Sequence, residues 1–337
     1  MIRVGVLGTG FGETHVETLK RTEGFEVAAV FGRDRSKLDQ IVAECQVAVT
    51  SDVEAVINDP EIDLISVCLP TQLHTEYAVA ALAAGKHVLV ETPAAESVAK
   101  AEEIAQAADK HQRLVFVDQF IKFSAPHRLA RDLLAGSELG PLKYLRAYNT
   151  TSPRWGDLGL ERNIDTFHIH LIDFAVDLLG LPVKVDSIGV GLSTSASCSS
   201  PCSSMTSLPS PEFASGLARP ASSSVTTVLG YEGAAVVLES LSWLPESTAF
   251  EIGFEAVCER GTMRFAATYG EHDSESFTMT TDGGGHRVLD VPEVDDYQEV
   301  MRHVAACISA NKRSPLIDIQ HAVDTLRVRE QVSSRIV

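Results

Sequence analysis

Basic residues are scarce in this chain of 337 residues, which has 28 Lys and Arg against 46 Asp and Glu and a formal net charge of −18. Nucleic acids and anionic membranes bind clustered positive side chains, so we expect neither as a partner. The sequence also lacks an apolar run of transmembrane length and a signal segment before its first strand. We therefore expect a cytoplasmic protein.

Paired cysteines are missing as well. The six cysteines are scattered and have no partner at metal-ligand spacing, which favours reduced thiols and predicts no metal centre. They are Cys45, Cys68, Cys198, Cys202, Cys258 and Cys307. The chain is nevertheless long enough for two domains, since single cores rarely exceed about 250–300 residues.

A glycine cluster follows the first apolar strand, predicted at residues 3–7, and opens a segment with helical spacing. In nucleotide-binding βαβ units such glycines allow a tight turn and let the backbone approach a pyrophosphate at the helix N-terminus. The motif G-x-G-x-x-G would place its third glycine where Glu13 stands, and Gly12 comes one residue early. We expect His15 either to approach the pyrophosphate or to lie on the surface. The predicted cofactor residues are Gly8, Gly10, Phe11 and Gly12.

The end of the second strand, predicted at residues 26–31, bears on the choice of cofactor. NAD sites place an acidic residue there to bind the ribose, whereas NADP sites offer an arginine. Gly32 and Arg33 follow this strand, so we favour NADP(H) over NAD(H). Two alternatives stay open, because Asp34 could reach the ribose and Arg33 could be an ordinary solvated side chain.

Strands and helices then alternate. Strands are predicted at residues 63–69 and 86–91, with a helix at residues 75–84 between them. Such alternation predicts a parallel, doubly wound sheet, in which ligands bind beyond the carboxyl ends of the strands. The predicted cofactor-site residues at this edge are Pro70, His74, Glu91, Thr92 and Pro93.

The run SVCLPTQLHTEYAVAALAAGKHVLVETP resembles the glucose-fructose oxidoreductase, inositol dehydrogenase and MocA (Gfo/Idh/MocA) family. The glycine turn ending at His15, the loop at residues 137–141 and the turn at residues 259–262 are also similar. The resemblance implies a Rossmann domain at 1–121 and an α+β substrate domain at 122–337 that forms a homodimer or homotetramer. Runs at residues 183–289 predict a large, open, mostly antiparallel sheet. A Ser- and Pro-rich insert at 193–224 is expected to be disordered.

The resemblance further implies NAD(P)-dependent hydride transfer to or from a sugar, polyol or related small carbonyl compound. In the family, a lysine in E-K-P and a D-x-x-x-H pair handle the proton, but here Thr92 and Thr166 replace the lysine and the aspartate. Threonine is no matched proton donor, so His170, Lys122 or Asp165 could serve instead. The alternatives are a reductase that acts on an easily reduced group, as the lysine-lacking biliverdin reductase branch of the superfamily suggests, a nucleotide-binding sensor that does not turn over, and a reaction that uses nicotinamide only transiently.

A helix is predicted at residues 163–179, with an apolar stripe on one face. Thr166 and His170 share a neighbouring face, so His170 is expected to handle the proton or contact the substrate. His168 lies on nearly the opposite side of a regular helix, where a structural hydrogen bond is the favoured role. The predicted catalytic residues are His170, Thr92, Lys122 and Thr166.

Overall fold

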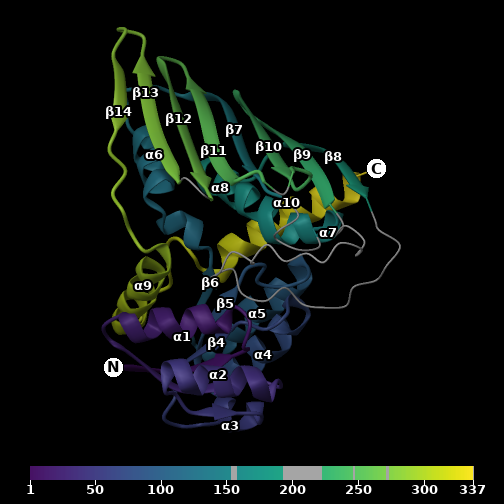
Figure 1. The fold of residues 1–337 in the computed structure, drawn as a ribbon, viewed down its shortest axis with the longest axis vertical. Helices are drawn as coiled ribbons and strands as arrows, with labels where there is room; N and C mark the ends of the chain where they lie inside the picture. The colour runs from purple at the N-terminus through teal and green to yellow at the C-terminus, as the bar shows by residue number, and fades with distance from the viewer. Residues whose placement is uncertain (153–157, 193–221, 246, 271–272, 337) are drawn as a thin grey trace. The chain divides into compact units, whose positions relative to one another are not determined.

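The computed structural model describes residues 1–152, 158–192, 222–245, 247–270 and 273–336. The chain forms two compact units (Figure 1). The first contains Met1–Phe123 and Asp295–Leu326, and the second contains the described residues of 124–294 together with those after Leu326.

The first unit is built on a six-stranded parallel sheet of order β3-β2-β1-β4-β5-β6. Its strands are β1 (Ile2–Leu7), β2 (Phe25–Phe31), β3 (Val49–Thr50), β4 (Leu64–Val67), β5 (His87–Glu91) and β6 (Val115–Asp118). The strand order reverses between β1 and β4. At such a reversal a crevice opens beyond the strand ends, which is where doubly wound folds bind ligands.

The helices of the first unit are α1 (Gly12–Arg21), α2 (Arg35–Cys45), α3 (Val53–Ile57), α4 (Thr71–Ala83), α5 (Val98–His111) and α9 (Asp296–Ala310), with a 3-10 turn η1 (Phe120–Phe123). Helix α4 begins at Thr71, four residues before the predicted start, because Pro70 occupies its N-cap. It ends before Gly85, whose φ of +82° suits the glycine expected after a helix.

A late segment of the chain completes the first unit. Helix α9 places Val300, Met301 and Val304, all fully buried, in the same core as Phe123 of η1. A division of the chain near residue 121 does not foresee this return of Asp295–Leu326 to the first unit.

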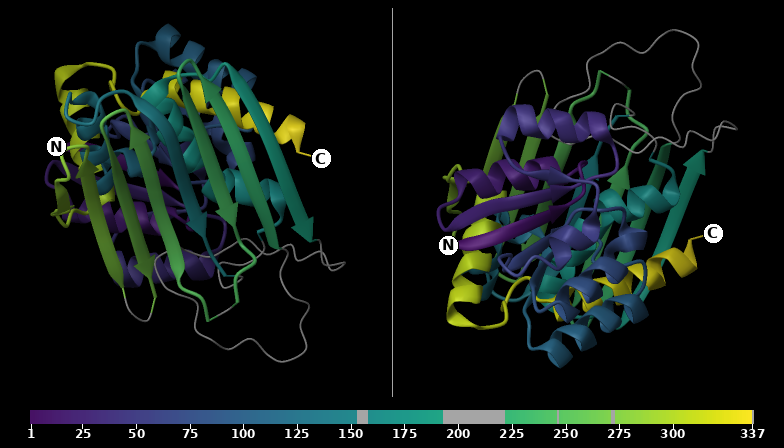
Figure 2. Two further views of the ribbon diagram at one scale, coloured as in Figure 1. Left: turned by 90° about the horizontal axis from the view of Figure 1, so that it is seen from above. Right: turned by 90° about the horizontal axis from the view of Figure 1, so that it is seen from below.

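The second unit carries an eight-stranded sheet of order β14-β13-β12-β11-β7-β10-β9-β8 (Figure 2, left). All neighbours are antiparallel except β7 and β10, so the mostly antiparallel prediction is confirmed. The strands are β7 (Leu142–Thr150), β8 (Lys184–Leu192), β9 (Ser222–Tyr231), β10 (Ala234–Leu241), β11 (Phe250–Cys258), β12 (Gly261–Tyr269), β13 (Ser274–Thr281) and β14 (His286–Leu289).

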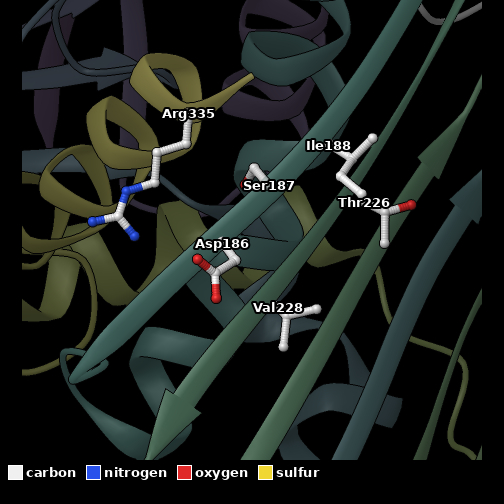
Figure 3. A pocket seen from close by; sticks show the side chains of 6 residues that line it. All are labelled: Asp186, Ser187, Ile188, Thr226, Val228 and Arg335. Atoms are coloured by element: carbon white, nitrogen blue, oxygen red, sulfur yellow. The ribbon is translucent and has the colours of Figure 1, made fainter. Parts of the chain in front are cut away.

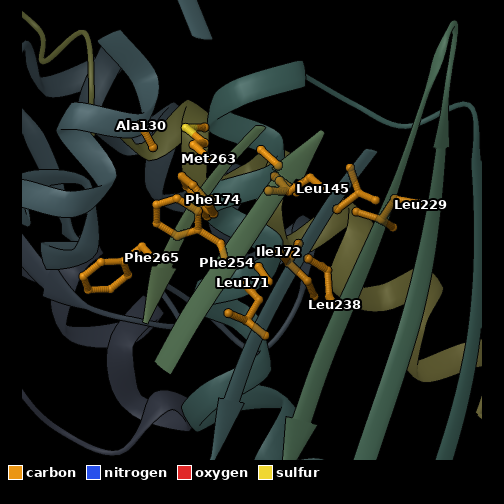
Figure 4. Packing of buried hydrophobic residues seen from close by; sticks show 14 of the residues in the cluster. Ala130, Leu145, Leu171, Ile172, Phe174, Leu229, Leu238, Phe254, Met263 and Phe265 are labelled. Atoms are coloured by element: carbon orange, nitrogen blue, oxygen red, sulfur yellow. The ribbon is translucent and has the colours of Figure 1, made fainter. Parts of the chain in front are cut away.

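Helices α6 (Ala125–Ala135), α7 (Leu160–Asn163) and α8 (Ile169–Leu179) belong to this unit, and α10 (Ile319–Arg335) is divided between the units after Leu326. One face of the sheet packs against α8, where Ile172 and Phe174 meet Phe254 and Leu238 (Figure 4). The insert predicted at residues 193–224 is too long, because residues 222–224 form the start of β9. Its residues 193–221 lie outside the described part of the chain.

The helix predicted at residues 163–179 is not regular. Residues Ile164–His168 form a π-helical segment, η3, between α7 and α8. A π-helical turn holds more residues than an α-helical one, so the 3.6-residue spacing assumed across this region fails before Ile169. No helix in the described part of the chain is both long and apolar enough to cross a membrane.

Candidate cofactor and acid–base site

The turn after β1 can be made only by glycine at its first position. Gly8 has a φ of +121°, and a Cβ atom there would lie 2.3 Å from the carbonyl oxygen of Cys68. Both the backbone conformation and the approach of the β4 end therefore exclude a side chain. The glycine turn thus lies against the end of β4, at the reversal of strand order.

The other two glycines explain the shortened motif. A Cβ atom at Gly12 would lie 3.2 Å from Val6 Cγ1, so Gly12 allows close packing of α1 on β1. This is the role of the third glycine in G-x-G-x-x-G, so Glu13 does not break the motif. Gly10 faces open space, with no atom within 4 Å of an added Cβ. No side chain caps the N-terminus of α1, so the turn fits a pyrophosphate beside Gly10.

The end of β2 packs against the same turn. A Cβ atom at Gly32 would lie 2.4 Å from Thr9 Cγ2, which leaves room only for glycine. Arg33 is exposed beyond it. Asp34 is the N-cap of α2, and its Oδ1 accepts hydrogen bonds from the amides of Ser36 and Lys37 at 2.9 and 3.3 Å. One of its two carboxylate oxygens, Oδ1, is therefore already engaged.

A compact polar cluster lies where β4, β5 and β6 end, and His15 of α1 is at its centre. The imidazole is 1% exposed, so the expected surface position of His15 was wrong, and its approach to the pyrophosphate stays a prediction. Its Nε2 donates to Glu91 Oε1 at 2.6 Å, and its Nδ1 lies 2.8 Å from Ser66 Oγ. The nearest polar atoms of His15, Cys68 and Glu91 are all within 4.8 Å of one another.

Asp118, the last residue of β6, is the second carboxylate of the cluster. Its Oδ2 lies 3.2 Å from His15 Nε2, and the side chain is 1% exposed. Among the described residues, neither of its carboxylate oxygens has a well-aligned hydrogen-bond donor. Its charge therefore depends on the nearby His15 imidazole rather than on an aligned hydrogen bond.

Three aromatic rings surround the cluster. Tyr297 of α9 stacks on Phe120 with a centroid distance of 4.8 Å and packs against Phe11 at 5.7 Å. Phe11 in turn lies edge-on to His15 at 5.8 Å. These rings exclude water from the cluster on one side and strengthen its electrostatic interactions.

The protonation of the cluster follows from its charges. Burial alone would lower the pKa of His15, but the Cys68 sulfur and the two carboxylates raise it well above 6.5. Burial raises the pKa of Glu91, the Asp118 charge adds to this, and His15 opposes it. The pKa of Tyr297 is raised by burial and then by the same carboxylates. The surroundings therefore favour the protonated form of His15 and also favour the protonated form of Glu91.

Thr92 and His74 fix the loop after β5. The Thr92 hydroxyl donates to the backbone carbonyl of Asp118 at 2.9 Å, and its amide donates to Glu91 Oε2 at 3.1 Å. The buried His74 ring lies between the carbonyl oxygens of Pro93 and Leu69, at 2.8 and 2.6 Å. Burial lowers the pKa of His74, so its role here is to hold the loop rather than to carry charge.

The remaining predicted groups fall outside this cluster. Lys122 is 4% exposed and donates to the carbonyl of Leu316 at 3.1 Å. Asp165 accepts two hydrogen bonds from Arg329, at 2.8 and 2.9 Å. His170 and Thr166 are partly exposed in the second unit. The catalytic roles of Lys122, Thr166 and His170 stay predictions.

His168 has the structural role that was favoured for it. It is fully buried, and its ring nitrogens lie 2.9 Å from the hydroxyls of Ser240 and Thr227. Burial lowers the pKa of His168 to about 3.

Sequence reasoning missed Asp118, Tyr297 and the inward position of His15. Asp118 had a usable signal, because it follows a buried strand parallel to the one that ends at Glu91. Tyr297 had none, since nothing in the sequence brings the start of α9 to the end of β6.

A hollow of about 280 Å³ lies on the sheet of the second unit (Figure 3). Its lining comes from β8, β9 and the end of α10, and consists of Asp186, Ser187, Ile188, Thr226, Val228 and Arg335. It contains none of the predicted site residues.

The glycine turn and the strand order define a dinucleotide-binding unit of the Rossmann type. Residues 2–119 match the Gfo/Idh/MocA family, an oxidoreductase family with an NAD-binding Rossmann fold. The dinucleotide-binding unit therefore matches the family that the resemblance implied.

Individual relatives agree with this assignment. The chain is 31% identical over 193 residues to the uncharacterized oxidoreductase YdgJ of Escherichia coli (strain K12), covering 55% of each chain. It is 25% identical over 193 residues to the scyllo-inositol 2-dehydrogenase (NADP(+)) IolW of Bacillus subtilis (strain 168), covering 55% of this chain and 53% of that protein. The match thus spans about half the length of these curated relatives.

The fold also matches solved structures along nearly the whole chain. Biliverdin reductase from Synechocystis sp. PCC 6803, in complex with biliverdin and NADP+, superposes with a TM-score of 0.77 at 20% identity. The superposition covers 99% of both chains. This likeness confirms the two-part architecture.

Proposed function

We propose that the protein is an NAD(P)-dependent oxidoreductase that transfers a hydride between the nicotinamide and a carbinol or carbonyl carbon of a sugar, polyol or related small compound. The observation that carries the proposal is the buried cluster of His15, Glu91 and Asp118 beside the glycine turn. Hydride transfer to or from an oxygen-bearing carbon needs a group that exchanges a proton, and a bare nucleotide-binding site does not.

The fold relates this cluster to the cofactor. Rossmann folds bind the two halves of a dinucleotide on either side of the strand reversal, with the pyrophosphate at the first helix N-terminus. Arg33, after β2, is on the side of the first half, so the second half falls over β4, β5 and β6. When bound, the nicotinamide donates or accepts the hydride. The protein's own part is to hold the pyrophosphate at Gly10 and to manage a proton at the strand ends.

The proposal favours NADP(H). Asp34 uses its Oδ1 to cap α2, which leaves only Oδ2 to accept from a ribose hydroxyl. Arg33 is exposed next to it and can pair with a 2′-phosphate. The similarity to IolW, described as an NADP(+)-dependent dehydrogenase of scyllo-inositol, supports both this choice and the polyol-like substrate class.

A nucleotide-binding sensor is the second candidate. The observation in its favour is that Thr92, at the position of the family lysine, uses its hydroxyl to bond the Asp118 carbonyl. A sensor would bind NADPH without consuming it.

The proposal includes self-association through the large sheet. Its outer face exposes apolar side chains, among them Ile188 (71% exposed) and Val288 (72% exposed), and the hollow in Figure 3 opens on the same sheet. Sedimentation at several protein concentrations tests this part, and a monomer at all of them contradicts it.

Single-turnover oxidation of bound NADPH tests the enzymatic proposal. The protein is mixed with sugars, inososes and small dicarbonyl compounds, alongside the variant Thr92→Lys. Consumption by the wild type supports an oxidoreductase. Tight NADPH binding with consumption only by Thr92→Lys favours the sensor.

A further inference from the structure

We propose that Glu91 is the catalytic residue that exchanges the substrate proton. His15 and Asp118 are positioning residues that hold Glu91 in place and restore its proton. The inference rests on the proposed oxidoreductase function, which it deepens. It assigns to this chain a proton-handling group in place of the lysine that the family pattern puts at Thr92.

Exposure singles out Glu91. Its side chain is 17% exposed, whereas those of His15 and Asp118 are each 1% exposed. A substrate hydroxyl can therefore reach Glu91 but neither of the other two groups. Of these three side chains, Glu91 is therefore the one placed to exchange a proton with a substrate.

The hydrogen bonds of Glu91 leave its Oε2 able to accept a proton from the substrate. Oε1 accepts from His15, and Oε2 accepts from the Thr92 amide at 3.1 Å. Because a carboxylate oxygen has two lone pairs, Oε2 can also accept a substrate proton. The Thr92 hydroxyl is bonded to the carbonyl of Asp118 and has no pKa suited to the task.

Charged and titratable groups face Glu91 from every element packed around it. His15 comes from α1, Asp118 from β6, Tyr297 from α9, and Cys68 from the end of β4. Two acids that share one imidazolium cannot both remain charged without cost, so the cluster accepts one further proton readily.

The step balances in both directions. In oxidation, the substrate C–H bond breaks as its electron pair leaves as hydride to the oxidised nicotinamide, and the hydroxyl proton passes to Glu91 Oε2. In reduction, hydride reaches the carbonyl carbon while protonated Glu91 gives its proton to the carbonyl oxygen. His15 returns a proton to Glu91 across their 2.6 Å hydrogen bond.

The first test compares Glu91→Gln with a matched control, Glu96→Gln, an exposed glutamate in the next loop. Each variant is assayed for NADPH binding and for single-turnover NADPH oxidation with a substrate found in the panel. We expect Glu91→Gln to slow the hydride step at least about 100-fold and to abolish its pH dependence, with NADPH affinity nearly unchanged. A rate within about threefold of wild type would overturn the inference while leaving the oxidoreductase function intact.

The second test needs neither turnover nor a stable Glu91 variant. Nuclear magnetic resonance of the free wild-type protein, with labelled histidine, follows the protonation of His15. The signal is assigned by its absence from His15→Gln. We expect an imidazolium that persists well above pH 6.5, and titration near that ordinary value would overturn the shared-proton arrangement. If the wild type binds NADPH but none of the compounds in the panel causes it to oxidise NADPH, the oxidoreductase proposal itself fails.

Discussion

Replacing His168 by glutamine should make the second unit less sensitive to acid. His168 is buried between two hydroxyls, and burial lowers its pKa to about 3 from 6.5. The unfolded chain therefore binds a proton at a higher pH than the folded chain does. The stability that this group contributes is complete above about pH 6.5 and is lost as the pH falls toward 3.

The size of the effect follows from the two pKa values. Each pH unit between them is worth about 1.4 kcal/mol, so the wild type should lose about 2 kcal/mol between pH 7 and pH 5 through His168 alone. Glutamine can hydrogen-bond both hydroxyls but does not titrate. The variant should therefore show a pH 7 to pH 5 difference smaller by this amount, whatever its absolute stability.

Urea unfolding followed by tryptophan fluorescence measures this difference. Trp243 belongs to the second unit, so its fluorescence reports the unfolding of that unit. The other histidines are the same in both proteins, so their contributions to the pH dependence of unfolding cancel in the comparison. His286→Gln, at an exposed position, is the control and should behave as the wild type. Equal pH dependence in wild type and His168→Gln would refute the reasoning.

Four further substitutions concern other sites. Gly8→Ala should cost about 2–4 kcal/mol of unfolding free energy in urea, because of backbone strain and the 2.3 Å contact. Gly10→Ala, with open space around it, should keep that stability but weaken NADPH binding, and equal stability losses would contradict the assigned glycine roles. Arg33→Ala should raise the Kd for NADPH about tenfold and leave that for NADH unchanged in fluorescence titrations; an equal effect on both would count against a 2′-phosphate contact. Arg329→Met should lower the urea stability of the second unit by about 1–3 kcal/mol, since it leaves Asp165 without its two hydrogen bonds, and an unchanged midpoint would show that the pair contributes nothing.

The sheet of the first unit could be predicted because each of its strands and helices has a signal within its own short stretch of sequence. A strand such as residues 63–69 reads as an apolar run, and Gly85 marks the end of the helix that follows. Spacing alone misjudged the glycine turn. The role of Gly12 depends on its distance from Val6, which the motif does not encode. Comparison with the spacing of G-x-G-x-x-G therefore made Glu13 look like a break in the motif.

The acid–base cluster was predicted only in part. Glu91 was found because it ends a strand, and Asp118 satisfies the same rule one strand later. His15 depends on which face of α1 turns toward the sheet, and Tyr297 depends on a contact between distant parts of the chain. The π-helical segment at Ile164–His168 was hidden for a similar reason, since apolar spacing does not reveal one extra residue in a turn.

The return of α9 to the first unit affects how the chain is made. During synthesis the six parallel strands leave the ribosome early, but Val300, Met301 and Val304, which fill their core, emerge only after the whole eight-stranded sheet. Nascent domains usually fold in order from the N-terminus. Here the unit that begins first is finished last, and until then the apolar surface that α9 will cover is available to chaperones.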